Sequence, residues 1–234
     1  MKPQILFLEP GNILDIEPGV EHRFIGLTDA SIVEFSTHHE DSDSYRSVPS
    51  KQIGKYHRYD YIISALSFFT DLRGKSTIDC SSGPGVGTDR LNAAGAIVLG
   101  LDIDSKVVRK SQEKFSHLRF DVDDLCKLSK VKDGVIDIFV CSETVEHIDK
   151  PQTIAAVQQI SRVVKSKGLV CVTTPADREI CLSQKNVEKD GHKQYLSADD
   201  LLNAFSQYKL EFAGLYYKQT AAEGANRVLI FSKE

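Results

Sequence analysis

The residues best suited to chemistry in this sequence are a glycine-rich loop and three acids within residues 79–121. Residues 80–88 read CSSGPGVGT, and glycines in such a loop let the backbone approach a ligand closely. Asp79, Asp102 and Asp121 each stand at the end of a short apolar run. Carboxylates accept hydrogen bonds from hydroxyl and amino groups, and they attract cations. The pattern therefore predicts a binding site for a polar ligand.

These acids can meet only if strands and helices alternate, so that the strand ends share one edge of a sheet. The strand at 77–79, the loop, a helix over 89–94 and a strand over 96–101 form half of a nucleotide-binding βαβ unit. Apolar periodicity and turn residues predict helices over 106–117, 151–164 (ended by Lys167-Gly168) and 198–205, and strands over 118–120, 136–141, 169–173, 210–217 and 227–232. This alternation predicts an α/β fold whose sheet is mostly parallel and covered on both faces.

Two classes of cofactor can use a glycine loop. A dinucleotide requires the spacing G-x-G-x-x-G, with its pyrophosphate at the helix N-terminus, but Gly87 falls one place early for that spacing. Asp79 and Glu143 would also bring negative charge close to a pyrophosphate. A cationic cofactor without phosphate reverses the sign of that interaction. The charges therefore favour the cationic cofactor, and a nicotinamide oxidoreductase is the weaker alternative.

Residues 77–175 resemble a class I S-adenosylmethionine-dependent methyltransferase of the small-molecule type. The acidic-x-Gly-x-Gly-x-Gly loop of that family corresponds to Asp79–Gly85, with Ser81 in place of the first glycine. We expect the backbone at Ser81 to avoid positive φ, because a side chain is strained there. The resemblance implies a doubly wound, mostly parallel, seven-stranded Rossmann-like sheet with an antiparallel terminal hairpin. It also implies transfer of a methyl group from S-adenosyl-L-methionine to a small molecule.

The resemblance implies specific roles around the cofactor. Gly83 and Gly85 would let the backbone approach its amino-acid part, and Asp79 would lie near its ammonium group. Asp102 would accept hydrogen bonds from both ribose hydroxyls, and Asp121 would accept one from the adenine amine beside Val122. The implied cofactor-binding residues are Asp79, Ser81, Gly83, Gly85, Asp102, Ile103, Asp121, Val122, Ser142 and Glu143.

Transfer to a hydroxyl group also needs a base that accepts its proton. The candidates are His147, which follows Glu146 after the fourth strand, and His192, in the segment GHKQY. The Glu-His pair is often structural in related enzymes, so a structural role for His147 stays open. Alignment of the acceptor with the methyl carbon should supply much of the acceleration. The sequence predicts no metal site.

Residues 1–45 form a predicted short all-β arm, with apolar runs separated by Pro-Gly turns. The segments Pro18–Phe24 and Val33–Thr37 resemble the C-terminal half of a cupin barrel, as in sugar-isomerase-like cupins. His22 matches a metal ligand of those cupins, but the other ligands have no counterpart here, so we expect a structural or docking role. The resemblance points to a sugar or sugar-nucleotide hydroxyl or amine as acceptor, and to a homodimer formed through the arm.

The predicted organisation has three parts: the arm at 1–45, a linker and packing or lid helix at 46–75, and a methyltransferase domain at 76–234. A formal net charge of −4 argues against a nucleic-acid partner, and no apolar run is long enough to span a membrane. Five cysteines without a CxxC pair favour buried thiols in a reducing, cytoplasmic setting. The alternative function is a non-catalytic assembly or binding subunit built on the same fold.

Overall fold

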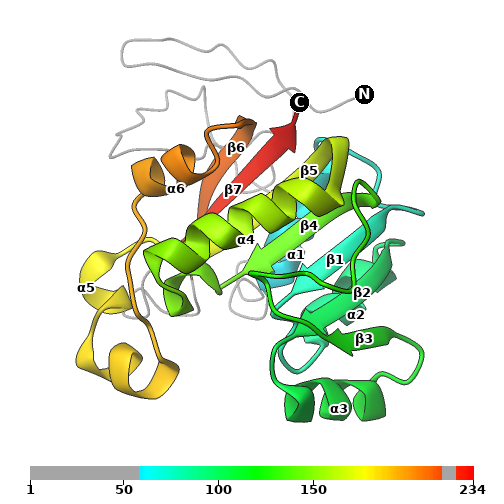
Figure 1. Cartoon of the computed structure of the whole chain (residues 1–234), viewed down its shortest axis with the longest axis horizontal. Helices are drawn as coiled ribbons and strands as arrows, with labels where there is room; N and C mark the ends of the chain where they lie inside the picture. The colour runs from blue at the N-terminus through cyan, green and yellow to red at the C-terminus, as the bar shows by residue number, and fades with distance from the viewer. Residues whose placement is uncertain (1–57, 218–224) are drawn as a thin grey trace, which may run out of the picture.

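Alternating strands and helices build a layered α/β fold in the computed structural model, which describes residues 58–217 and 225–234 (Figure 1). Seven strands form one sheet in the order β3-β2-β1-β4-β5-β7-β6. The strands are β1 (Ser76–Cys80), β2 (Ile97–Asp102), β3 (Arg119–Val122), β4 (Ile136–Ser142), β5 (Val164–Pro175), β6 (Tyr208–Tyr217) and β7 (Ala225–Lys233). β1 to β5 pair in parallel, and β7 runs antiparallel between β5 and β6. The predicted fold class is thereby confirmed for the described residues, and the predicted arm lies outside them.

Short polar signals set where the helices begin. Asp104 caps the first turn of α3, and capping boxes at Asp149 with Gln152 and at Ser197 with Asp200 begin α4 and α6. The helices are α1 (Arg58–Ser67), α2 (Val86–Ala93), α3 (Ser105–Lys114), α4 (Lys150–Val163), α5 (Arg178–Cys181) and α6 (Ala198–Ala204), with single turns η2 (Val145–His147) and η3 (Asn186–Asp190).

Each face of the sheet carries its own apolar core. One core packs α4 and α6 against the sheet, and the rings of Phe205 and Phe231 stack in it with centroids 4.8 Å apart. The other core packs Ile62 and Leu66 of α1, together with Leu91 of α2, against the opposite face. In Figure 1, α4 accordingly lies in front of the sheet and α1 behind it. The prediction of a sheet covered on both faces is therefore confirmed.

Several predicted boundaries were wrong. The helix predicted over 151–164 ends at Val163, because Val164 already pairs with Ile136 and begins β5. Gly168 lies within that strand instead of ending the helix, and a Cβ there would lie only 3.1 Å from the carbonyl oxygen of Asp137. α2 begins at Val86, directly after the left-handed residue Gly85. α5 and η3 were not predicted.

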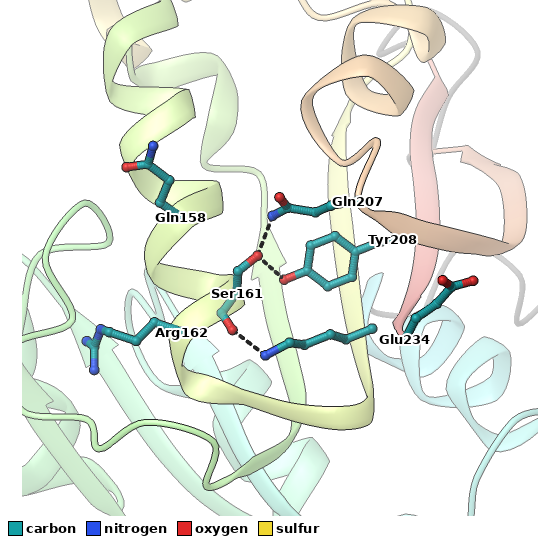
Figure 2. A pocket seen from close by; sticks show the side chains of 7 residues that line it. Gln158, Ser161, Arg162, Gln207, Tyr208 and Glu234 are labelled. Carbon is teal, nitrogen blue, oxygen red and sulfur yellow. Dashed lines mark hydrogen bonds between the residues drawn. The ribbon is translucent and has the colours of Figure 1, made fainter.

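A shallow hollow of about 440 Å³ opens at the edge of the sheet where β5 and β6 begin (Figure 2). Ser161 lies at its centre. The hydroxyl of Ser161 forms hydrogen bonds with the hydroxyl of Tyr208, at 2.8 Å, and with the side-chain amide of Gln207. The amine of Lys233 donates to the carbonyl oxygen of Ser161. Ligands of parallel α/β sheets bind at the opposite edge, where the strands end. The hollow is therefore separate from the predicted cofactor site.

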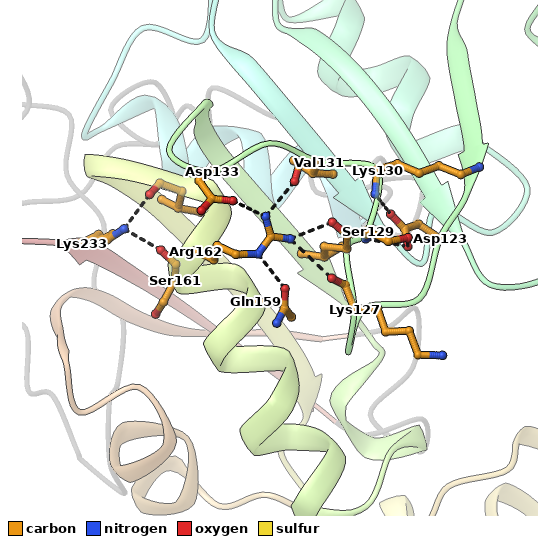
Figure 3. A network of polar contacts seen from close by, with 12 residues as sticks. Asp123, Lys127, Ser129, Lys130, Val131, Asp133, Gln159, Ser161, Arg162 and Lys233 are labelled. Atoms are coloured by element: carbon orange, nitrogen blue, oxygen red, sulfur yellow. Dashed lines mark hydrogen bonds and ion pairs between the residues drawn. The ribbon is translucent and has the colours of Figure 1, made fainter.

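Arg162 joins the end of α4 to the loop between β3 and β4 (Figure 3). Its guanidinium donates to the carbonyl oxygens of Leu128 at 2.8 Å and Val131 at 2.9 Å, and to the side chain of Gln159 at 2.8 Å. Arg162→Ala should lower the free energy of unfolding by about 2 kcal/mol, because it leaves these acceptors without a donor. Urea denaturation monitored by circular dichroism measures the change.

The matched control is Arg109→Ala. Arg109 makes an exposed ion pair with Glu113 on α3, and such a pair contributes less than about 0.5 kcal/mol. Equal losses of stability in the two variants would contradict the structural role of Arg162.

Candidate active site

The acids predicted to bind a ligand lie at or directly after the carboxyl ends of four adjacent parallel strands. Asp79 lies in β1 between Gly100 of β2 and Val140 of β4, and Asp121 pairs with Leu101 in the register of β2 and β3. Glu143 follows directly after β4. This edge of the sheet is where open α/β folds bind ligands.

Asp79 is fully buried beneath the loop. Its carboxylate accepts hydrogen bonds from the hydroxyls of Tyr59, in α1, and Thr88, in α2; the bond from Thr88 is 2.7 Å long. Burial raises the pKa of Asp79 to about 6, although both hydrogen bonds act in the opposite direction. The two donors hold the acid in place, and neither was predicted to contact Asp79.

This pKa predicts how stability depends on pH. The folded protein keeps the proton of Asp79 up to about pH 6, whereas an unfolded chain releases it near the ordinary value of 3.8. Because the folded state binds more protons in this window, stability is greatest below it and falls as the pH rises. The free energy of unfolding of the wild type, minus that of Asp79→Asn, should fall by roughly 1–3 kcal/mol from pH 4 to pH 7. Urea titrations at several pH values measure it, and a flat difference would contradict the assignment.

The loop after β1 turns through three left-handed residues: Ser81, Gly83 and Gly85 have φ values of 59°, 51° and 80°. The expectation that Ser81 avoids positive φ was wrong. Neighbouring contacts impose this conformation, because the amide of Ser82 donates to the carbonyl oxygen of Leu101 at 2.8 Å. The Gly83 amide donates to the Asp102 carboxylate at 3.0 Å. Two adjacent anchors on β2 thus hold the loop.

Asp102 and Ile103 lie at the exit of β2. One carboxylate oxygen of Asp102 accepts from Gly83, and the other accepts from the amide of Asp104 at 3.0 Å. Ile103 is 70% exposed, so its large apolar side chain is open to solvent. This pair therefore presents a hydrogen-bonding group beside an open apolar surface.

Asp121 and Val122 end β3. The carboxylate of Asp121 accepts from the amide of Val122 at 2.8 Å and forms an ion pair with Lys130. The hydrogen bond from Lys130 lowers the pKa of Asp121. Sequence reasoning missed Lys130, which lies in a loop and carries no motif. A ligand amine at Asp121 would share the carboxylate with this lysine.

Ser142 and Glu143 are held by a residue of the neighbouring strand. Thr173 of β5 lies 2.9 Å from the hydroxyl of Ser142 and donates to the carboxylate of Glu143 at 2.9 Å. The amide of Glu143 donates to the carbonyl oxygen of Thr173, and φ at Glu143 is 50°. Thr173 thus orients the acid that follows β4. Its place at the end of a predicted strand was the only sequence signal.

The two predicted base candidates meet after β4. The rings of His147 and His192 have centroids 4.8 Å apart at an interplanar angle of 79°. The amides of Lys193 and Gln194 both donate to the carbonyl oxygen of Glu146, at 2.7 and 3.2 Å, and so dock the segment that carries His192 onto η2.

Gln194 reinforces this docking. Its side-chain amide donates to the carbonyl oxygens of Val145, at 3.1 Å, and Ile148, at 2.6 Å. A glutamine in a polar segment has no distinguishing sequence signal, and sequence reasoning missed it. The backbone around η2 and the segment after η3 therefore form one unit.

Comparison with known proteins identifies the central part of the chain. The model of a family described as "Methyltransferase domain" matches residues 78–172, from β1 to β5. These residues form a methyltransferase domain. The matched residues include the loop and all of the strand-end acids.

Relatives in sequence carry one description. The ubiquinone biosynthesis O-methyltransferase of Glaesserella parasuis is 30% identical over 111 residues, which cover 44% of this chain and 46% of that protein. The protein of the same description from Nitrosomonas europaea is 28% identical over 122 residues, covering 49% of this chain and 47% of that protein. The chain thus spans slightly less than half the length of these two relatives.

Solved structures share the fold at lower identity. The magnesium protoporphyrin IX methyltransferase of Synechocystis, solved with bound SAH, has a TM-score of 0.63 and 18% identity over 82% of this chain and 90% of that one. An S-adenosylmethionine-dependent methyltransferase from Mesorhizobium loti has a TM-score of 0.61 and 14% identity over 74% of this chain and 96% of that one. Within residues 58–217 and 225–234, no helix has the length and apolar character needed to cross a membrane.

Proposed function

We propose that this protein transfers a methyl group from S-adenosylmethionine to a hydroxyl oxygen of a small molecule. The observation that carries the proposal is the placement of Asp79, Asp102 and Asp121 at one edge of the sheet of a methyltransferase domain. The description of the sequence relatives as O-methyltransferases supports oxygen as the acceptor atom.

Two features of the loop fit the cofactor. A side chain at Gly83 would meet nothing within 4 Å, so the loop presents open space above its backbone. The hydroxyl of Ser82 is buried and has no hydrogen-bond partner, so a donor or acceptor on a ligand could satisfy it. The exposed side chain of Ile103 offers an apolar surface for a ring.

When bound, S-adenosylmethionine supplies an electrophilic methyl group on a positively charged sulfur. Asp102 would hold the ribose hydroxyls, and Asp121 and Val122 would hold the adenine. Asp79 and Glu143 place negative charge at the end of the site that receives the ammonium and sulfonium groups. His147 and His192 are the candidates to take the proton of the acceptor hydroxyl.

Two segments left unassigned by the cofactor residues should select the acceptor. Residues 176–197 include α5, η3 and His192 and follow β5 directly, at the same edge of the sheet. Residues 45–70 include α1, which contacts Asp79 through Tyr59. Nothing in the described residues supports the carbohydrate acceptor suggested by the arm, which lies outside them.

Calorimetry tests the cofactor directly. The full chain should bind S-adenosylmethionine and its demethylated product S-adenosylhomocysteine with a stoichiometry of one. NAD serves as the matched control, because it shares the adenosine but carries a pyrophosphate, and it should not bind. If neither sulfur compound binds at high micromolar concentration, the proposal is wrong, and binding of NAD alone would favour an oxidoreductase.

A further inference from the structure

We infer that Glu146, His147 and His192 bind a divalent transition-metal ion, for which Zn²⁺ is the matching probe. Each of the three side chains offers one ligand atom, and these atoms all lie within 4.8 Å of one another. The sequence predicted no metal site, because His192 is remote from the Glu-His pair along the chain. The fold brings the three together.

The backbone makes this arrangement specific. Glu146 and His147 belong to η2, and His192 follows Gly191, which ends η3 in a left-handed conformation. The backbone amides of Lys193 and Gln194 donate hydrogen bonds to the carbonyl oxygen of Glu146. The site therefore exists only when the segment after η3 docks on η2.

The ring of His192 is oriented as in metal-binding histidines. Its Nδ1 lies 2.7 Å from the carbonyl oxygen of Cys181. A carbonyl oxygen can only accept, so Nδ1 carries the hydrogen and Nε2 keeps a lone pair. Histidines that bind metals usually donate their other ring nitrogen in this way, which fixes the tautomer.

His147 is held by hydrogen bonds with the backbone of Asp190 and Gly191. Its ring is only partly exposed and stands at an interplanar angle of 79° to the ring of His192, so the two rings line the same small region. Each of the two imidazoles offers one ring nitrogen as a ligand atom.

Glu146 supplies the charge. Its side chain is 1% exposed, and the hydroxyl of Thr174 donates to one carboxylate oxygen over a long 3.3 Å. The charge of Glu143 repels this carboxylate, and the charge of Arg58 attracts it. A buried carboxylate near a second one is costly unless a cation compensates the charge. A metal ion at this point would provide that compensation.

Two imidazoles and one carboxylate indicate the kind of ion. This set suits Zn²⁺ and other transition metals, whereas Mg²⁺ prefers oxygen ligands only. Three protein ligands also leave a coordination position open, as in catalytic zinc sites. If the proposed function holds, that position would receive the acceptor hydroxyl and lower its pKa, and the two histidines would then be ligands and not bases.

Zinc analysis after dialysis tests the site. The full-length protein is stripped with EDTA, dialysed against buffered Zn²⁺, and compared with His192→Ala and His147→Ala by elemental analysis. Other histidines and cysteines of the chain can also bind zinc. The zinc held at this site is therefore the difference in zinc content between the wild type and each variant. The wild type should hold one more ion than either variant, and an excess of Mg²⁺ should not displace it. Each substitution should weaken zinc binding at this site at least about tenfold.

Two matched controls accompany these variants. Cys181→Ser removes the buried thiol beside His192 but keeps the carbonyl that orients the ring, and His117→Ala removes a histidine paired with Asp89 on another part of the fold. Both should bind as much zinc as the wild type. Equal zinc contents in the wild type and in both folded site variants would overturn the inference.

Folding and function are separated by two further measurements. Thermal melting without metal shows whether the variants fold. If they do not, the test uses the wild type alone: one equivalent of Co²⁺ should produce the visible absorption of a low-coordinate site. Absence of that absorption would overturn the inference. Calorimetry with S-adenosylmethionine is run on the same samples. Retained cofactor binding without a zinc difference refutes the metal site alone, whereas zinc binding without cofactor binding refutes the proposed function alone.

Discussion

Asp102→Ala should weaken the binding of S-adenosylmethionine about a hundredfold or more. The proposed function places both ribose hydroxyls on this carboxylate, and each hydrogen bond to a charged group contributes about 1.5–3 kcal/mol. S-adenosylhomocysteine contains the same ribose, so its affinity should fall by the same factor. Calorimetry with both ligands measures the two losses.

Asp104→Ala is the matched control for this variant. Asp104 is an acid on the same loop, but its carboxylate accepts from the amide of Lys106 at 2.8 Å and caps α3. Its loss should change affinity less than about threefold, because capping acts on stability. Asp102 also anchors the amides of Gly83 and Asp104, so thermal melting must accompany the titrations. Unchanged affinity in a folded Asp102→Ala protein would refute the ribose assignment.

Gly85→Ala should lower the free energy of unfolding by about 2–5 kcal/mol, the sum of a left-handed backbone cost and overpacking. At Gly85, φ is +80°, and a Cβ would lie 2.8 Å from Cζ of Phe120. The same ring lies close against the backbone of Gly100, where an added Cβ would stand 2.4 Å from its Cδ1, so the ring has little room to move away from the loop. Since Phe120 precedes Asp121 in β3, the substitution should also weaken cofactor binding. Urea denaturation and calorimetry measure the two effects.

Gly74→Ala separates the two causes. Gly74 has a similar φ of +72°, but a Cβ there would meet nothing within 4 Å. The Gly74→Ala variant should therefore lose only the free energy that the left-handed backbone costs, about 1 kcal/mol, and should keep its affinity for the cofactor. If both variants lose the same stability, packing of Phe120 against the loop contributes nothing.

The role of the two histidines depends on whether a metal is present. As bases they would need to exchange protons with an acceptor, whereas as ligands they would stay neutral throughout turnover. The hydrogen bond from Nδ1 of His192 to Cys181 is compatible with both roles, because it leaves Nε2 available in either case. Zinc analysis therefore decides which role the activity measurements should test.

Local sequence pattern alone was sufficient to predict much of the fold of this protein and the location of its site. The alternation of apolar runs with amphipathic segments predicted the α/β class, and the acids that end those runs predicted the edge of the sheet that carries the site. Both depend on side-chain periodicity and on the geometry of parallel strands, which are properties of short segments. The same locality explains the errors at Val164 and Ser81, where pairing with β4 and anchoring to β2 override the local preference.

Only the tertiary structure decided which groups meet at that edge. Tyr59 reaches Asp79, and Lys130 reaches Asp121. His192 comes to lie against His147. None of these partners is adjacent in sequence, and none belongs to a motif. Their proximity follows from the order of strands in the sheet and from the docking of residues 191–194 on η2. Such contacts arise from the packing of whole elements, so a pattern within one segment cannot predict them.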